Sequence, residues 1–246
     1  MDCKRIYLSV VIPAYNESKI LSKNIEKVAS CLSSKDYTFE LIVVDDGSVD
    51  NTKDLITSMI QVNTNIKLMV NIKNMGKGFS VKSGVLAAQG KYILFSDADF
   101  STSIEELEKL LPYFEQGFDI VVGSRAIRGA NILLKQSWLR QSMGKVFNLL
   151  VRLLCLADIK DTQCGFKCFS RDAAGKIFPL QRFSGFCFDV EVLNIAKRCG
   201  YKIKEVPIVW VNRVDSRVGI IKDSLEMFLD LFKIRFNILR GFYNVT

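Results

Sequence analysis

The first half of the chain alternates short apolar runs with segments in which apolar residues recur at helical spacing. The apolar runs cover residues 6–12, 39–44, 66–70, 91–96 and 119–123. Uninterrupted apolar runs are typical of strands buried on both faces, and their alternation with helices is typical of a parallel sheet. The sequence therefore predicts an α/β fold with a mainly parallel central sheet flanked by helices.

Helical periodicity fills the spaces between these runs and dominates the second half. In the first half, helices are predicted at 21–32, 51–61, 77–88 and 104–114. Ser103 and Glu106 have the spacing of a capping box at the start of the last of these. The second half is predicted to contain an amphipathic helical stretch at 131–157, a strand at 166–169, a helix at 186–199, a strand at 202–210 and a C-terminal amphipathic helix with Leu225, Leu229, Phe232, Phe236, Leu239 and Tyr243 on one face.

Polar and acidic residues follow three of the predicted strands, at the point where each strand ends. They form the groups Tyr15-Asn16-Glu17, Asp45-Asp46 and Asp97-Ala98-Asp99. The carboxyl ends of parallel strands lie at one edge of the sheet, where such folds bind ligands. Two carboxylates separated by one residue can share a hard divalent cation, which prefers oxygen ligands and is often completed by substrate phosphates. Taken alone, an Asp-x-Asp turn is also compatible with a solvated loop.

Basic and glycine residues are expected at the same edge. The segment 74–84 places Gly76, Lys77 and Gly78 at a predicted helix start, which suits phosphate oxygens. Its glycine spacing matches neither a dinucleotide fingerprint nor a P-loop. Arg125 follows the fifth predicted strand and offers a guanidinium to phosphate.

Composition excludes several classes of function. The chain contains no histidine, so Ser-His and Cys-His nucleophiles are excluded. Its net charge of +8 favours anionic partners, but no nucleic-acid-binding motif is recognised and no nucleic acid is expected as a partner. Seven cysteines without a signal peptide indicate a reducing compartment. Cys164 and Cys168 lack a second closely spaced pair, so buried thiols are favoured over a zinc site.

The amphipathic stretch in the second half has a basic character. Residues 126–160 contain six lysines and arginines against one acidic residue, Asp158. A basic amphipathic helix is suited to the interface of an anionic membrane. The alternative is that this stretch and the C-terminal helix simply pack on the core. No apolar run is long enough for a spanning helix, since the run 149–157 is interrupted by Arg152.

Seven motifs, in this order along the chain, resemble those of family 2 glycosyltransferases with the GT-A fold. Within that family the chain most resembles the polyprenyl-phosphate (dolichyl-phosphate) sugar transferases. The segments Asp161–Lys167 and Phe188–Leu193 are most similar to the dolichyl-phosphate glucosyltransferase branch. The motifs are VVIPAYNE, VVDDGS, NMGKG, FSDAD, VVGSR, DTQCGFK and FDVEVL, and the resemblance covers about Val10–Val218.

The resemblance implies roles for individual residues. A divalent ion, Mg²⁺ or Mn²⁺, would be bound by Asp97 and Asp99, with Ser101 nearby. Asp189 stands where related enzymes place a base or a contact to the donor sugar, and Arg213 and Arg217 would join Arg125 at the acceptor phosphate. Arg125 and Lys167 would face the donor phosphates. The residues implied to bind the nucleotide sugar are Pro13, Tyr15, Glu17, Asp45, Asp46, Gly76, Lys77 and Asp97.

The resemblance also implies the reaction: inverting transfer of a hexose, with UDP-glucose as the first choice of donor, to polyprenyl or dolichyl phosphate. A GDP-mannose-dependent transferase and a family 2 enzyme acting on a sugar hydroxyl of a cell-surface glycan are the alternatives. We expect a catalytic domain over 1–218 with interface helices inserted at 131–157, and a C-terminal amphipathic helix over 219–246. Without an N-terminal anchor, attachment to the cytoplasmic face of a membrane would be peripheral, either direct or through a partner protein.

Overall fold

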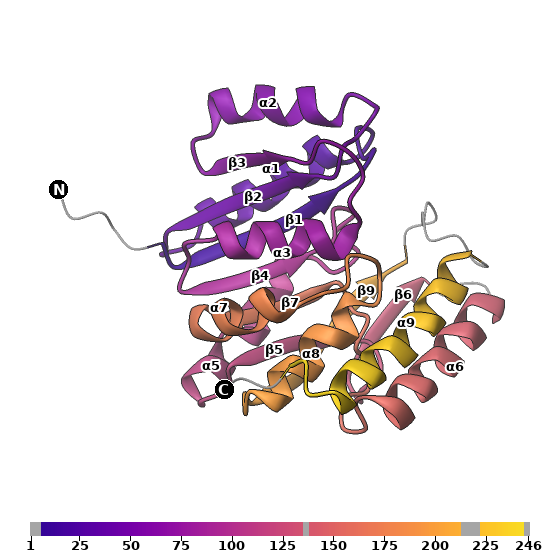
Figure 1. The fold of residues 1–246 in the computed structure, drawn as a ribbon. Helices are drawn as coiled ribbons and strands as arrows, with labels where there is room; N and C mark the ends of the chain where they lie inside the picture. Colours follow the sequence, from indigo (N-terminus) through magenta and orange to yellow (C-terminus); the bar gives the residue numbers. More distant parts are fainter. Residues whose placement is uncertain (1–5, 135–137, 213–221, 244–246) are drawn as a thin grey trace.

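The computed structural model describes residues 6–134, 138–212 and 222–243, and its main element is a seven-stranded sheet (Figure 1). The strands are ordered β3-β2-β1-β4-β7-β5-β8, and β7 is antiparallel to both of its neighbours. The other pairings are parallel, which confirms the predicted fold class. The strands are β1 (Leu8–Ala14), β2 (Phe39–Asp45), β3 (Ile66–Val70), β4 (Tyr92–Ser96), β5 (Ile120–Ser124), β7 (Phe166–Ser170) and β8 (Ile203–Pro207).

Helices cover both faces of this sheet, as Figure 1 shows for α3 on one side and α1 on the other. Strand β1 illustrates the two-sided core, because Val10 and Ile12 join the cluster under α1, while Val11 joins the cluster under α3, α7 and α8. Each face is thus closed by apolar side chains that alternate along the strand. The helices of this layer are α1 (Leu21–Ser33), α2 (Thr52–Val62), α3 (Lys77–Ala87), α7 (Arg171–Leu180) and α8 (Phe188–Arg198).

Some predicted boundaries differ from the structure. Strand β1 continues through Pro13 to Ala14, although the sequence was expected to end the strand at the proline. Pairing of β1 with β4 ends at Val11, and a residue without an N–H is tolerated where one neighbour is missing. Helix α7 was not predicted; it begins directly after β7, where the Ser170 side chain accepts a hydrogen bond from the Ala173 N–H.

The segment predicted as one helix at 104–114 consists of a 3₁₀ turn (Ile104–Glu106), α4 (Leu107–Leu110) and α5 (Pro112–Glu115). The predicted capping box is wrong. The Ser103 hydroxyl donates to the carboxylate of Glu105, while the carboxylate of Glu106 pairs with Lys109 and accepts the N–H of Val209. Glu106 is therefore used for a long-range contact instead of the local cap.

A second, two-stranded sheet lies on the side of the large sheet where β4 and β5 end. Residues 131–134, predicted to begin a long helix, instead form β6 (Asn131–Leu134), which pairs in parallel with β9 (Val209–Val211). The predicted strand at 202–210 is correspondingly divided between β8 and β9. Helix α6 (Trp138–Leu154) and helix α9 (Lys222–Leu239) pack beside one another next to this sheet (Figure 1). None of the described helices is long and apolar enough to cross a membrane.

Candidate active site

The carboxyl ends of β1, β2, β4 and β5 bring the predicted site residues to one edge of the large sheet. Asp97 follows β4 directly, and its N–H donates to the carbonyl of Gly165 at 3.1 Å. A Cβ atom on Gly165 would lie 1.9 Å from Asp97 Oδ2, so no larger residue fits there without moving the carboxylate. The glycine before β7 therefore fixes where Asp97 stands.

Lys77, the first residue of α3, forms an ion pair with Asp97. Its Nζ lies 2.7 Å from Asp97 Oδ1, an oxygen that is itself buried. Burial lowers the pKa of Lys77, but the carboxylates of Asp97 and Asp189 outweigh it and hold that pKa above its usual value. Lys77 is thus charged and stands directly at the predicted metal ligand.

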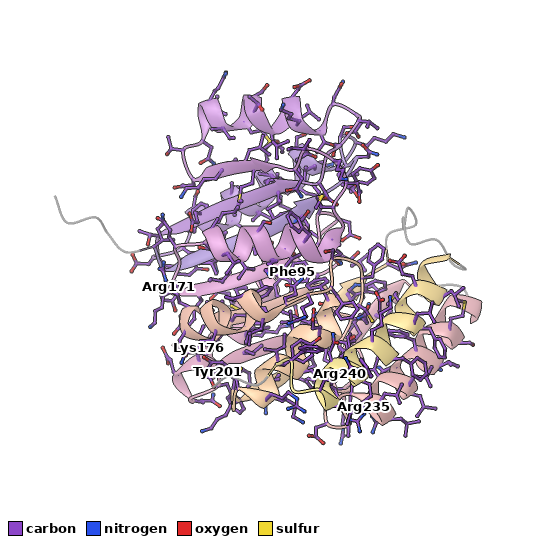
Figure 2. The ribbon with its side chains drawn as sticks, in the orientation of Figure 1. Phe95, Arg171, Lys176, Tyr201, Arg235 and Arg240 are labelled. Atoms are coloured by element: carbon purple, nitrogen blue, oxygen red, sulfur yellow. The ribbon has the colours of Figure 1, made fainter. Side chains whose placement is uncertain are left out.

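A second ion pair joins Lys167 on β7 to Asp189 in the first turn of α8. Both side chains are almost completely buried, with exposed fractions of 1% and 4%, and Lys167 also donates to the carbonyl of Cys164 at 2.6 Å. Burial raises the pKa of Asp189, although Lys167 and Lys77 favour its charged form. Phe95 contacts both lysines, with its ring centre 5.3 Å from Lys77 Nζ and 5.7 Å from Lys167 Nζ; Figure 2 labels this residue.

Arg125, directly after β5, is held by Asp161. Its Nε and backbone N–H donate to Asp161 Oδ2 and its Nη2 donates to Oδ1, all at 2.8 Å. Burial raises the pKa of Asp161, but the Arg125 guanidinium outweighs it and holds the pKa below its usual value. Glu205 accepts the N–H of Asp161 at 3.0 Å, and Trp210 packs against the guanidinium at 5.4 Å. Sequence reasoning gave Asp161, Glu205 and Trp210 no role, although Asp161 begins one of the quoted motifs.

Asp99, the second carboxylate of the Asp-x-Asp turn, accepts hydrogen bonds from within the same loop. Asp99 accepts the N–H and the hydroxyl of Ser101, both at 2.9 Å, and Phe100 between them has a left-handed φ of 46°. No group of three or more acidic, cysteine or histidine residues in the described ranges could hold a metal alone. Asp97 and Asp99 nevertheless offer oxygen ligands, and Oδ1 of Asp97 faces the Lys77 ammonium, in whose place another cation could bind. They therefore fit Mg²⁺ or Mn²⁺ if a bound diphosphate supplies further oxygens.

The acidic pair after β2 organises the neighbouring loops. The carboxylate of Asp46 accepts the side chain of Asn71 at 2.8 Å and the N–H groups of Met75 and Gly76 at 2.9 Å. Asp45 accepts the N–H of Ser48 at 3.3 Å, together with its hydroxyl. Both carboxylates thus bind the protein itself, and Asp46 fixes the loop that leads into α3.

The other residues implied to hold the nucleoside lie at the end of β1. Pro13 is within the strand, and the ring of Tyr15 is 37% exposed beyond it. The N–H of Glu17 donates to the Thr52 hydroxyl at 2.8 Å, which ties this loop to the start of α2. Arg213 and Arg217, implied to meet the acceptor phosphate, lie outside the described residues.

The glycines at the start of α3 make room for protein backbone. A Cβ atom on Gly76 would lie 2.4 Å from the carbonyl oxygen of Ser184, and Gly76 has a φ of 98°. That carbonyl accepts the N–H groups of Gly78 at 2.7 Å and Phe79 at 3.3 Å. These two N–H groups are therefore not available to phosphate, and the cation that this helix start presents to the site is Lys77.

Comparison with known proteins identifies relatives over nearly the whole chain. The model of the family "Glycosyl transferase family 2" matches residues 9–178. The chain is 37% identical over 252 residues to a dolichyl-phosphate beta-glucosyltransferase of Dictyostelium discoideum, covering 98% of this chain and 77% of the relative. It is 34% identical over 247 residues to the human protein of the same description, covering 95% and 76%.

The fold is also shared with a solved structure. Glucosyl-3-phosphoglycerate synthase from Mycobacterium tuberculosis, in complex with Mn²⁺, UDP-glucose and phosphoglyceric acid, superimposes with a TM-score of 0.71. The match covers 94% of this chain and 80% of that one at 18% sequence identity. This likeness supports the assignment of the GT-A fold.

Replacing Lys77 by glutamine should strengthen binding of a divalent ion to the protein without nucleotide. The Lys77 ammonium and a metal ion compete for the same oxygen of Asp97, and removing a unit charge this close should tighten Mn²⁺ binding by about tenfold or more. Electron paramagnetic resonance of free Mn²⁺ during titration measures the affinity. Lys53→Gln, on the exposed side of α2, removes the same charge and is the control. Equal affinities in the wild type and Lys77→Gln would contradict the competition.

Proposed function

This chain belongs to glycosyl transferase family 2, and we propose that it transfers glucose from UDP-glucose to dolichyl phosphate, giving a β-linked lipid-phosphate sugar. The observation that carries the proposal is the similarity to dolichyl-phosphate beta-glucosyltransferases across 95–98% of the chain. That similarity favours glucose over the mannose alternative. It also favours a phosphate acceptor over a sugar hydroxyl.

The donor end of the site is suited to a sugar diphosphate. Asp97 and Asp99 would hold Mg²⁺ or Mn²⁺, which when bound stabilises the negative charge of the departing diphosphate. Lys77 stands beside Asp97, and Arg125 is oriented by its bidentate contact with Asp161. A guanidinium oriented in advance stabilises developing charge on a phosphate oxygen without reorganising. We therefore assign Lys77 and Arg125 to the donor phosphates, with Arg125 shared with the acceptor phosphate.

The acceptor end needs little proton transfer. A phosphomonoester has a second pKa near 6 and is largely dianionic at pH 7, so it can attack the anomeric carbon directly. An in-line attack inverts that carbon, which is consistent with a β-linked product from an α-linked donor. The carboxylate of Asp189 is buried and paired with Lys167. This placement suits a group that orients the site better than one that collects a proton from the acceptor.

The reaction is tested by incubating the protein with Mg²⁺ or Mn²⁺, a short dolichyl phosphate and one nucleotide sugar at a time. UDP-glucose should give a lipid product heavier by one hexose in mass spectrometry, and GDP-mannose should not. Asp99→Ala should abolish the product, because it removes one of the two carboxylates at the site. Product from GDP-mannose alone, or hexose transfer only to a sugar hydroxyl, would overturn the proposal.

Asp189→Asn separates an orienting role from base catalysis. General-base catalysis typically contributes about 10²–10⁴-fold, so an orienting Asp189 predicts a loss in kcat below about 10³-fold and an unchanged acidic limb of the pH–rate profile. Because the substitution leaves Lys167 buried without its anion, thermal unfolding should be measured alongside. A larger loss together with disappearance of the acidic limb would assign the base to Asp189.

An apolar surface on α6 and α9 is the proposed contact with the membrane that carries the lipid. We define the α6–α9 surface by eight side chains on the outward sides of these helices, each more than 45% exposed: Val146, Leu149, Leu153, Leu225, Leu229, Phe232, Phe236 and Leu239. The buried side of α9 is made by other residues, including Leu231 and Ile234, so the outward apolar residues are not used by the core.

Basic side chains accompany this surface. Arg235 belongs to the same helix as its phenylalanines and Arg240 directly follows that helix; Figure 2 labels both. The Arg240 guanidinium lies 4.2 Å from the ring centre of Phe236. A large exposed apolar patch marks an interaction site, and apolar residues beside basic ones suit an anionic lipid interface. We therefore infer peripheral attachment to the cytoplasmic face of a membrane, with a protein partner as the alternative contact.

Negative charge introduced on the α6–α9 surface should weaken vesicle binding without unfolding the protein. The double variant Phe232→Asp/Phe236→Asp removes two exposed rings and adds two negative charges, and it should reduce co-sedimentation with anionic vesicles at low salt by about tenfold or more. Val49→Asp/Val62→Asp, at two exposed valines outside this surface, is the control. Equal sedimentation of all three proteins would contradict a membrane role for this surface.

A further inference from the structure

The loop between α7 and α8, residues 181–187, lies against the start of α3. The carbonyl of Ser184 accepts the N–H groups of Gly78 and Phe79, and the side-chain amide of Gln181 donates to the carbonyl of Gly78 at 2.9 Å. Lys82, one turn further along α3, donates to the carbonyl of Gln181 at 2.7 Å. The loop therefore determines where the first turn of α3 stands, and with it Lys77.

The opposite side of the same loop contacts α9 and the residues after it. The Cys187 thiol donates to the carbonyl of Met227 at 3.4 Å, and the Arg182 guanidinium lies 4.6 Å from the ring centre of Phe242. The 181–187 loop is thus placed between the helix start that carries Lys77 and the helix that carries the α6–α9 surface.

Glu191 on α8 joins these parts through a buried carboxylate. It accepts the N–H of Arg182 at 3.0 Å, the N–H of Phe183 at 2.9 Å and the hydroxyl of Tyr243 at 2.8 Å. Glu191 and Tyr243 both have an exposed fraction of 0%. A buried carboxylate is expensive unless its oxygens are satisfied, so each of these donors matters to the position of the others.

Neither residue is at the edge of the sheet where Asp97, Arg125 and Lys167 meet. Glu191 instead binds the backbone of the 181–187 loop, and Tyr243 comes from the segment after α9. Nothing in the proposed chemistry uses a second buried carboxylate on α8. Its hydrogen bonds hold the loop and the segment after α9 together, which is the expected pattern for a residue that acts through its neighbours.

We propose that Glu191 and Tyr243 are positioning residues for the nucleotide-sugar donor. They fix the 181–187 loop on the start of α3, keep Lys77 at Asp97, and so make the C-terminal segment part of the donor site. The inference rests on the proposed function, because it assumes that the edge containing Lys77 and Asp97 binds a sugar diphosphate. It assigns donor affinity to a residue contributed by the end of the chain, beyond the helix proposed to contact the membrane.

The test is Tyr243→Phe, which removes one hydroxyl and keeps the ring that fills the core. A net hydrogen bond contributes about 0.5–1.5 kcal/mol, so the KM for UDP-glucose should rise by about two- to tenfold while kcat changes by less than about twofold. The Kd of UDP, measured by calorimetry in the presence of Mn²⁺ and without lipid, should rise by the same factor. Glu191→Gln should raise the KM and the Kd at least as much, because the NH₂ group of an amide cannot accept a hydrogen bond as the second carboxylate oxygen does.

Tyr201→Phe is the matched control. The Tyr201 hydroxyl also donates to a carboxylate, that of Asp172, at 2.7 Å, but this partner is exposed in the first turn of α7. Figure 2 labels Tyr201 close to Lys176 on the same helix. Its KM and Kd should match the wild type. A positioning role is overturned if Tyr243→Phe lowers the unfolding temperature but leaves KM and Kd unchanged, or if kcat falls at constant KM. The proposed function has a separate test: it is wrong if the wild type makes no glucosyl lipid. In that case the Kd of UDP still shows whether Tyr243 and the 181–187 loop position the donor site.

Discussion

Buried charge must be paired, and this constraint determines the arrangement of the site. Lys77 with Asp97, Lys167 with Asp189 and Arg125 with Asp161 are three cation–carboxylate pairs at one edge of the sheet. Lys167–Asp189 is buried on both sides, and removing one member of such a pair typically costs about 3–5 kcal/mol, because the other charge then has no partner. The other two pairs are partly exposed, so solvent reduces this cost for them. Each pair also joins elements distant in the sequence: α3 to β4, β7 to α8, and the end of β5 to the segment before β7. The charges therefore position the same elements that form the site.

Close backbone approach is the second requirement, and glycines satisfy it. Gly165 allows Asp97 to lie against the start of β7, and Gly76 allows Ser184 to lie against the start of α3. A side chain at position 165 would displace the Asp97 carboxylate, and one at position 76 would displace the loop that contains Ser184. Neither neighbour is an apolar side chain that could repack around the added atoms. The two close approaches support the Lys77–Asp97 pair from both sides, since one holds the carboxylate and the other holds the helix that carries the lysine.

The sequence predicted the elements whose signal is local. Strands β1 to β5 were placed to within about two residues, because each is an apolar run bounded by polar residues, and the edge where their carboxyl ends meet followed from topology. The contacts between residues that are distant in the sequence could not be predicted from it. The run at 131–134 reads equally well as the start of a helix, and only its contact with β9 makes it a strand. Glu106 looked like a local cap but bonds to Val209, and Asp161 became meaningful only once it met Arg125.

The same charge pairing suggests why metal and nucleotide sugar would enter the site together. The three pairs are balanced in charge, while Asp45, Asp46 and Asp99 accept hydrogen bonds from neutral groups and add negative charge at this edge. A divalent ion alone must displace the Lys77 ammonium from Asp97, and a diphosphate alone adds two negative charges beside carboxylates. A metal–diphosphate complex brings charges that nearly cancel, so its arrival changes the net charge of the site little. Lys77 could then exchange Asp97 for a phosphate oxygen and stay paired with an anion, whereas a lysine without a carboxylate partner would be an unpaired charge before the donor binds.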